Sequence, residues 1–138
     1  MLTKLEHCAI RTTKLKETRD FYVDLLGLED GDRPPFPFPG HWLYVGDWAV
    51  VHLVGIDPDD PQGLVDYLGE INPDELHGSG AVDHIAFRAE DAAELIERVK
   101  NANIAYRDRK VPQMELYQVF LEDPNGITVE LNYFGITD

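Results

Sequence analysis

The 138-residue sequence has one cysteine, Cys8, and no apolar run that approaches the length of a membrane span. One thiol cannot form an intrachain disulfide, and a spanning helix requires about 20 apolar residues. The first residues also lack the apolar segment of a signal peptide. These absences predict a cytoplasmic protein with no membrane partner.

Basic residues are also scarce, since 12 Lys and Arg stand against 26 Asp and Glu and give a formal net charge of −14. Nucleic acids and anionic membranes both require a basic face, so neither is an expected partner. Hydrophobic residues make up 43% of the chain, as in a globular protein. We expect a single domain over residues 1–138 that acts on a small molecule.

The clearest pattern in the sequence lies near its C-terminus, where residues 119–134 predict a strand, a tight turn and a second strand. Asp123-Pro124-Asn125-Gly126 supplies the turn. From residue 127 to 133 apolar and polar residues alternate, which places Glu130 on the face opposite the apolar side chains. A single Glu in such a strand most simply faces solvent, unless residues elsewhere provide partners for it.

Similar patterns predict the other elements. Alternation predicts strands at residues 4–11, 28–32, 81–88 and 104–109 and a hairpin at residues 41–54. Helical spacing predicts one helix that is capped by Thr12-Thr13 and stops at Gly27, and another that begins at Glu90-Asp91. Residues 33–40 are too rich in proline for a helix or a central strand. Residues 56–80 predict a long acidic loop.

The predicted elements occur twice in the same order, and LEHCAIR aligns with VDHIAFR. His7 and His84 are 84 − 7 = 77 positions apart, while His52 and Glu130 are 130 − 52 = 78 apart. This agreement indicates two copies of one βαβββ module, at about residues 1–55 and 81–138. We therefore predict an α+β fold in which two paired modules form an open, U-shaped mixed-sheet cup with helices on the outside.

His7, His52, His84 and Glu130 occupy equivalent positions in the two modules and form the candidate site. By alternation they lie on the face opposite the residues that pack on helices, so a common cup would collect all four. Three imidazoles and a carboxylate are ligands for Fe, Ni, Co, Zn or Mn. The sequence thus predicts one divalent metal ion per site, without deciding which metal.

The paired modules, the His in LEHCAIR and VDHIAFR, and the ending EDPNGITVEL resemble the vicinal oxygen chelate superfamily. This group includes glyoxalase I, methylmalonyl-CoA epimerase, fosfomycin-resistance thiol transferases, bleomycin-resistance proteins and extradiol dioxygenases. The resemblance implies His7, His84 and Glu130 as metal ligands, and a homodimer. Glyoxalase I has Glu where this chain has His52 and the epimerase has Gln, so the role of His52 as a ligand stays open.

The number of protein ligands sets how many metal positions are left for the substrate. With four, two octahedral positions are left for adjacent oxygens of a small substrate, and the metal stabilises an enediolate or alkoxide while Glu130 or His52 moves a proton. With three, a catecholate and dioxygen also fit. A glyoxalase-type lyase or isomerase is the predicted function. The alternatives are a non-haem Fe(II) extradiol-type dioxygenase and a non-catalytic, bleomycin-type binding protein.

Two observations separate these alternatives. The extradiol pattern that the resemblance supplies has a His before the last hairpin and a Tyr three residues before the Asp, whereas this chain has Val111-Pro112-Gln113 and Phe120. A sequestering protein has no need of metal ligands. Within the cup, Trp42, Tyr44 and Tyr117 are predicted to bind the substrate.

Overall fold

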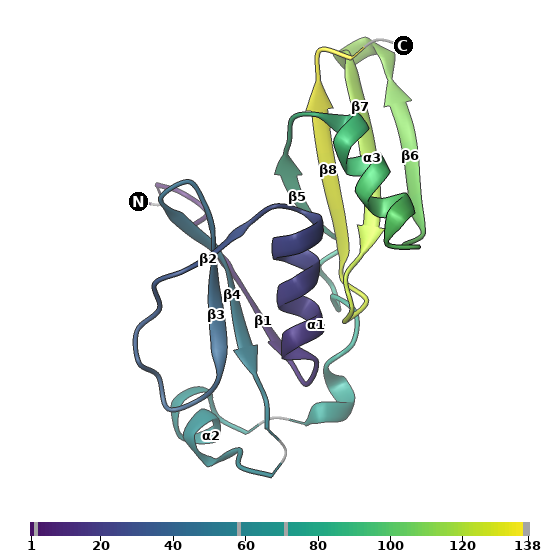
Figure 1. Ribbon diagram of the computed structural model, residues 1–138. Coiled ribbons are helices and arrows are strands. Elements are labelled where there is room, and N and C mark those ends of the chain that lie inside the picture. The colour runs from purple at the N-terminus through teal and green to yellow at the C-terminus, as the bar shows by residue number, and fades with distance from the viewer. Residues whose placement is uncertain (2, 58, 71, 137–138) are drawn as a thin grey trace. The chain divides into compact units, whose positions relative to one another are not determined.

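The computed structural model describes residues 1, 3–57, 59–70 and 72–136. The chain divides into two compact units, Met1–Leu76 and His77–Asp138, and each contains one four-stranded mixed sheet (Figure 1). Within the described residues, no helix has both the length and the apolar character that crossing a bilayer would require.

The first unit consists of β1 (Cys8–Thr12), α1 (Leu15–Asp20), η1 (Phe21–Leu25), β2 (Glu29–Gly31), β3 (Gly40–Val45), β4 (Trp48–Gly55), α2 (Gln62–Leu68) and η2 (Pro73–Glu75). Its strands lie in the order β1-β4-β3-β2, with β1 parallel to β4 and the other pairs antiparallel. Helix α1 packs against β4. The core of this unit contains Leu43, Val51 and Leu53, none of which is more than 1% exposed.

The second unit consists of β5 (Ile85–Arg88), α3 (Ala92–Asn101), β6 (Tyr106–Val111), η3 (Pro112–Met114), β7 (Leu116–Glu122) and β8 (Thr128–Phe134). Its strand order is β5-β8-β7-β6, again with the first pair parallel and the others antiparallel. Leu95 and Val99 of α3 are buried, and α3 lies over this sheet in Figure 1. The opposite face of the sheet carries Glu130.

The two units therefore repeat one βαβββ order, and the predicted α+β fold of two modules with open mixed sheets is confirmed. In each unit the helical segment follows the first strand of the sheet and precedes the three antiparallel strands. The pairing of the two modules into one cup stays a prediction.

The structure differs from the prediction at the first strand and its helix. The strand begins at Cys8 rather than residue 4, and in the segment before it the Glu6 carbonyl accepts from the Trp48 indole at 2.8 Å. The Thr12 hydroxyl accepts from the Lys14 amide but does not cap α1. The helix then widens into the π-helical segment η1 before Gly27, whose φ of 86° ends it.

Candidate metal centre

In the first unit, His52 lies between two aromatic rings. Its ring centroid is 3.8 Å from that of His7 and 4.1 Å from that of Trp42, with interplanar angles of 13° and 10°. The strand register explains the stack, because both Ala9 and Trp42 pair with His52. His7, two residues before Ala9, therefore lies on the same face of the sheet. The structure brings together the two predicted site residues of this unit, with Trp42 beside them.

One ring nitrogen of His52 is engaged by the main chain. Its Nε2 lies 3.1 Å from the carbonyl oxygen of Ala49. A carbonyl can only accept, so Nε2 carries the proton and donates. Burial lowers the pKa of His52 and the adjacent His7 lowers it further, so the neutral imidazole is favoured. Neutral His52 thus keeps its lone pair on Nδ1.

His7 and His84 show the opposite arrangement, since each follows an acidic residue that binds its Nδ1. The Nδ1 of His7 lies 3.0 Å from Glu6 Oε1, and the Nδ1 of His84 lies 2.8 Å from Asp83 Oδ2. An ionised carboxylate only accepts, so Nδ1 is the donor in both histidines, and in the neutral form of each ring Nε2 carries the lone pair. Metal-binding histidines are commonly oriented in this way through their second nitrogen.

In the second unit, His84 lies beside Glu130. Ala86 pairs with Glu130 across β5 and β8, so His84 shares the face of that carboxylate. The Nε2 of His84 is 3.6 Å from Glu130 Oε1. Glu130 itself is only 8% exposed. Both residues line a pocket of about 320 Å³, together with Arg107, Phe120 and other side chains.

The second oxygen of Glu130 belongs to a hydrogen-bonded chain that the sequence analysis missed. Asn132 Nδ2 donates to Glu130 Oε2 at 2.9 Å, and Gln118 Nε2 donates to Asn132 Oδ1 at 2.9 Å. The chain begins at Arg109, whose Nε donates to Gln118 Oε1 at 2.6 Å. Only the register of β6, β7 and β8 brings these residues together.

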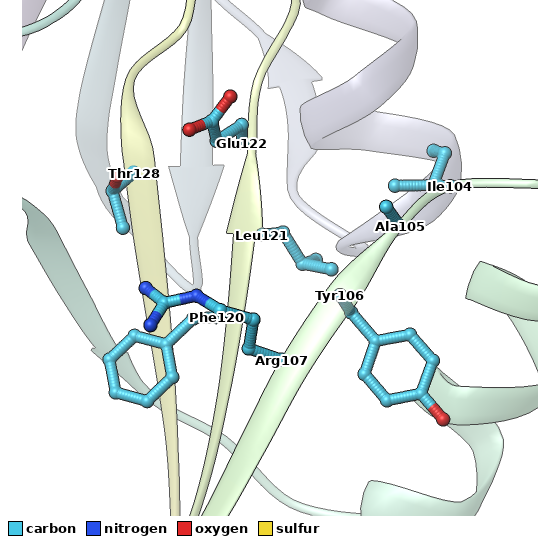
Figure 2. A pocket seen from close by; sticks show the side chains of 8 residues that line it. All are labelled: Ile104, Ala105, Tyr106, Arg107, Phe120, Leu121, Glu122 and Thr128. Atoms are coloured by element: carbon cyan, nitrogen blue, oxygen red, sulfur yellow. The ribbon is translucent and has the colours of Figure 1, made fainter.

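A second pocket of about 340 Å³ lies where β6 begins and β7 ends. Figure 2 shows the Arg107 guanidinium beside the Phe120 ring, with its central carbon 5.1 Å from the ring centroid. The guanidinium carbon of Arg109 lies over the same ring, 5.3 Å from its centroid. The two pockets share Arg107, Phe120 and Thr128, so they are parts of one continuous surface.

The three residues predicted to bind substrate have different surroundings. Trp42 joins the His52 stack. Tyr44 donates through its hydroxyl to the Asp32 carbonyl at 2.6 Å. Tyr117 lies on the face opposite Glu130, because Phe120 is the residue that pairs with Glu130. There its hydroxyl donates to Asp108 Oδ2 at 2.7 Å. The structure therefore does not bring Tyr117 to the Glu130 face.

The candidate ligands form two pairs, His7 with His52 in the first unit and His84 with Glu130 in the second. Within the described residues, no three His, Cys, Asp or Glu side chains gather as a ligand set. The convergence of the four residues on one ion thus stays a prediction. The donor chemistry fits a divalent metal, because neutral imidazole nitrogens and a carboxylate oxygen are its usual protein ligands.

The sequence model of the Glyoxalase/Bleomycin resistance protein/Dioxygenase superfamily matches residues 4–131. The chain belongs to this superfamily. The resemblance to vicinal oxygen chelate proteins is thereby confirmed. The Glyoxylase I 4 of Arabidopsis thaliana is 27% identical over 133 residues, which cover 94% of this chain and 70% of that protein. The lactoylglutathione lyase of Escherichia coli O157:H7 is 24% identical and covers 93% and 90% of the two chains.

Solved structures of the superfamily show the same fold. The lactoylglutathione lyase from Agrobacterium tumefaciens superposes with a TM-score of 0.63 at 25% identity, covering 96% of this chain and 94% of that one. The fosfomycin resistance protein FosX from Listeria monocytogenes, in complex with Mn(II), gives 0.67 at 17% identity and covers 97% and 94%. These likenesses show the fold of the chain.

Proposed function

We propose that this chain is a metal-dependent lyase or isomerase of the glyoxalase type, with His7, His84 and Glu130 as ligands of one divalent metal ion. The observation that carries the proposal is the matched orientation of the two histidines. An acidic neighbour holds Nδ1 of each one and leaves its Nε2 available. Relatives named lactoylglutathione lyase cover nearly the whole chain and support the same reaction class.

His52 lies outside the proposed ligand set. Its Nε2 already donates to the Ala49 carbonyl, and its ring is flanked by His7 and Trp42. A ligand role through Nε2 would break this hydrogen bond and require the imidazole to change its tautomer. We propose that His52 instead fixes the plane of the His7 ring by stacking.

A divalent metal at this site supplies Lewis acidity toward two adjacent oxygen atoms of a small substrate. Within the protein, Glu130 is the proposed proton acceptor. Three carboxylates line its pocket, but Asp83 is bonded to His84 and Asp108 to Tyr117. Glu130 keeps Oε1 directed toward His84, because its other oxygen is held by Asn132. It can take a proton from one substrate carbon and return it to the next.

The proposed substrate is the hemithioacetal of glutathione and a 2-oxoaldehyde, whose isomerisation gives a lactoylglutathione-type thioester. The test is thioester formation from glutathione and methylglyoxal, measured after loading the protein with Ni, Co, Zn, Mn or Fe(II) in turn. We expect turnover with at least one metal, loss of turnover in Glu130→Ala, and turnover retained in Glu97→Ala on the exposed face of α3. No thioester with any of these metals would contradict the proposal.

An extradiol-type dioxygenase is the second candidate, and the Ala49 hydrogen bond of His52 is the observation that favours it. Without His52 as a ligand, three positions of an octahedral metal are open, enough for a catecholate and dioxygen. Oxygen consumption by the Fe(II)-loaded protein with catechols, in the absence of thioester formation, would select this reaction over the lyase.

We also propose that the protein functions as a homodimer, as the superfamily resemblance implies. Sedimentation velocity at micromolar concentration checks this assembly directly. A single species with the 15.7 kDa mass of one chain would contradict it.

A further inference from the structure

Four polar side chains on the Glu130 face of the second sheet form one continuous hydrogen-bonded chain. It runs from Arg109 on β6 through Gln118 on β7 to Asn132 and Glu130 on β8. Arg109 pairs with Gln118 and Gln118 with Asn132, so the chain crosses three adjacent strands at one level. Asn132 then reaches Glu130 two residues away on the same face.

The two ends of the chain fix the orientation of both amides. The Arg109 guanidinium can only donate, so the oxygen of Gln118 must face it. The nitrogen of Gln118 is then left for Asn132, whose own nitrogen is left for Glu130. Reversing either amide would place two donors or two acceptors together. Every hydrogen bond in the chain is therefore donated in the direction of Glu130.

Hydrogen bonds that are all donated toward Glu130 stabilise its ionised carboxylate, which is shielded from water. Gln118 is 6% exposed and Glu130 is 8% exposed, so water competes little for these groups. Hydrogen bonds are stronger in such surroundings, and a broken one leaves a costly unpaired group. The chain engages Glu130 Oε2 and leaves Oε1 on the side of His84 Nε2.

We propose that Arg109, Gln118 and Asn132 are positioning residues that hold Oε2 of Glu130 and present Oε1 to the divalent metal. The inference rests on the proposed function, because it takes Glu130 as a metal ligand. Residues that orient a ligand in this way set the affinity of the site without touching the metal.

Arg107 offers a matched control for Arg109. Both arginines are exposed residues of β6, lie on the same face two residues apart, and place their guanidinium carbons 5.1 and 5.3 Å from the Phe120 ring centroid. Arg107 pairs with Phe120, whereas Arg109 pairs with Gln118 and donates to it. Replacing each by Met keeps the aliphatic stem and removes the guanidinium.

The experiment measures the dissociation constant of Zn(II) by competition with a chromophoric chelator, using the full-length protein. The variants are Arg109→Met, Gln118→Glu and Asn132→Leu, with Arg107→Met as control. Gln118→Glu keeps an acceptor for Arg109 but cannot donate to Asn132. We expect dissociation constants roughly 10- to 100-fold higher in the three chain variants, and a smaller change in Arg107→Met, which lines the same pocket but is not part of the chain. The absorption spectrum of the Co(II)-loaded proteins should change in the same three variants.

Thermal unfolding of the same variants separates positioning from simple packing. Lower stability with an unchanged Zn(II) dissociation constant in all three chain variants would overturn the inference. An equal loss of affinity in Arg107→Met would overturn it as well. If Glu130→Ala abolishes binding while the chain variants bind normally, the proposed function stands and this inference fails. Wild-type protein that binds neither metal would overturn both.

Discussion

The imidazole of His52 lies flat against that of His7, with ring centroids 3.8 Å apart and planes inclined by only 13°. His52 uses its Nε2 on a main-chain carbonyl, while an acidic neighbour holds Nδ1 of His7. The two histidines therefore have different roles in the proposed site. We propose that His7 binds the metal through Nε2, and that His52, whose Nε2 is engaged by Ala49, supports the His7 ring by stacking.

Substitutions of His52 distinguish a residue that supports the His7 ring by stacking from one that binds the metal. Aromatic stacking contributes about 0.5–1.5 kcal/mol, so His52→Ala should raise the metal dissociation constant by up to about tenfold. His52→Phe keeps a stacking ring without a nitrogen ligand, and its metal stoichiometry by elemental analysis should equal that of the wild type. Loss of the metal in His52→Phe would instead establish His52 as a fourth ligand.

Asp83 should affect metal binding through the tautomer of His84. Asp83→Ala removes the acceptor of the Nδ1 proton, and we expect metal affinity to fall about tenfold, the lower end of the usual range, because the Asp83 side chain is 94% exposed. Asp83→Asn retains an oxygen acceptor and should lie close to the wild type. Equal affinities in Asp83→Ala and the wild type, measured by chelator competition, would show that the carboxylate does not orient His84.

Asp91 should stabilise the second unit by capping α3. Its side chain accepts from the Glu94 amide at 3.1 Å, and its φ is 63°, in the left-handed region. Asp91→Ala loses the cap and places Ala in an unfavourable conformation, at a cost of about 1–3 kcal/mol. Asp91→Asn keeps a capping oxygen and tolerates this conformation. Urea unfolding checks both variants, and equal losses would contradict the capping role.

Ionisation of the buried Tyr133 side chain should lower the free energy of unfolding at alkaline pH. Burial, followed by the charge of Asp91, raises the pKa of Tyr133 to about 12, above the value of about 10 in an unfolded chain. The neutral phenol of Tyr133 therefore adds about 2–3 kcal/mol to the free energy of unfolding. This stabilisation is fully present below pH about 10 and is lost as the pH rises toward 12.

Tyr133→Phe isolates this contribution. The pKa of Tyr117 is also raised, by burial and by its bond to Asp108, so the wild type and the variant must be compared with each other. Between pH 9 and 12 the free energy of unfolding should fall less in Tyr133→Phe. Parallel curves would contradict the assignment.

The periodicity of apolar and polar residues along the sequence predicted those parts of the fold that depend on short-range spacing. Alternation from residue 127 to 133 placed Glu130 opposite the apolar face, and the structure confirms that face. The duplicated modules followed from the spacing of His7, His52, His84 and Glu130. An acidic residue directly before His7 and before His84 was a further visible signal for their tautomers.

Contacts across strands could not be predicted in this way, because a hairpin pattern fits several registers. The chain from Arg109 to Glu130 requires Arg109 opposite Gln118 and Gln118 opposite Asn132. Tyr117 fails to reach the Glu130 face for the same reason, since the turn sets which residues of β7 share that face. The π-helical segment η1 likewise follows from main-chain bonds that side-chain spacing does not encode.

The most direct test of the account is the metal stoichiometry of purified wild-type protein and of His7→Ala, His84→Ala and Glu130→Ala, measured by elemental analysis after equilibration with a divalent metal and removal of the excess. The account predicts one tightly held ion per site in the wild type and loss of that ion in each of the three variants. Full occupancy in any one of them would contradict the assignment of that residue as a ligand, and with it the proposed metal centre.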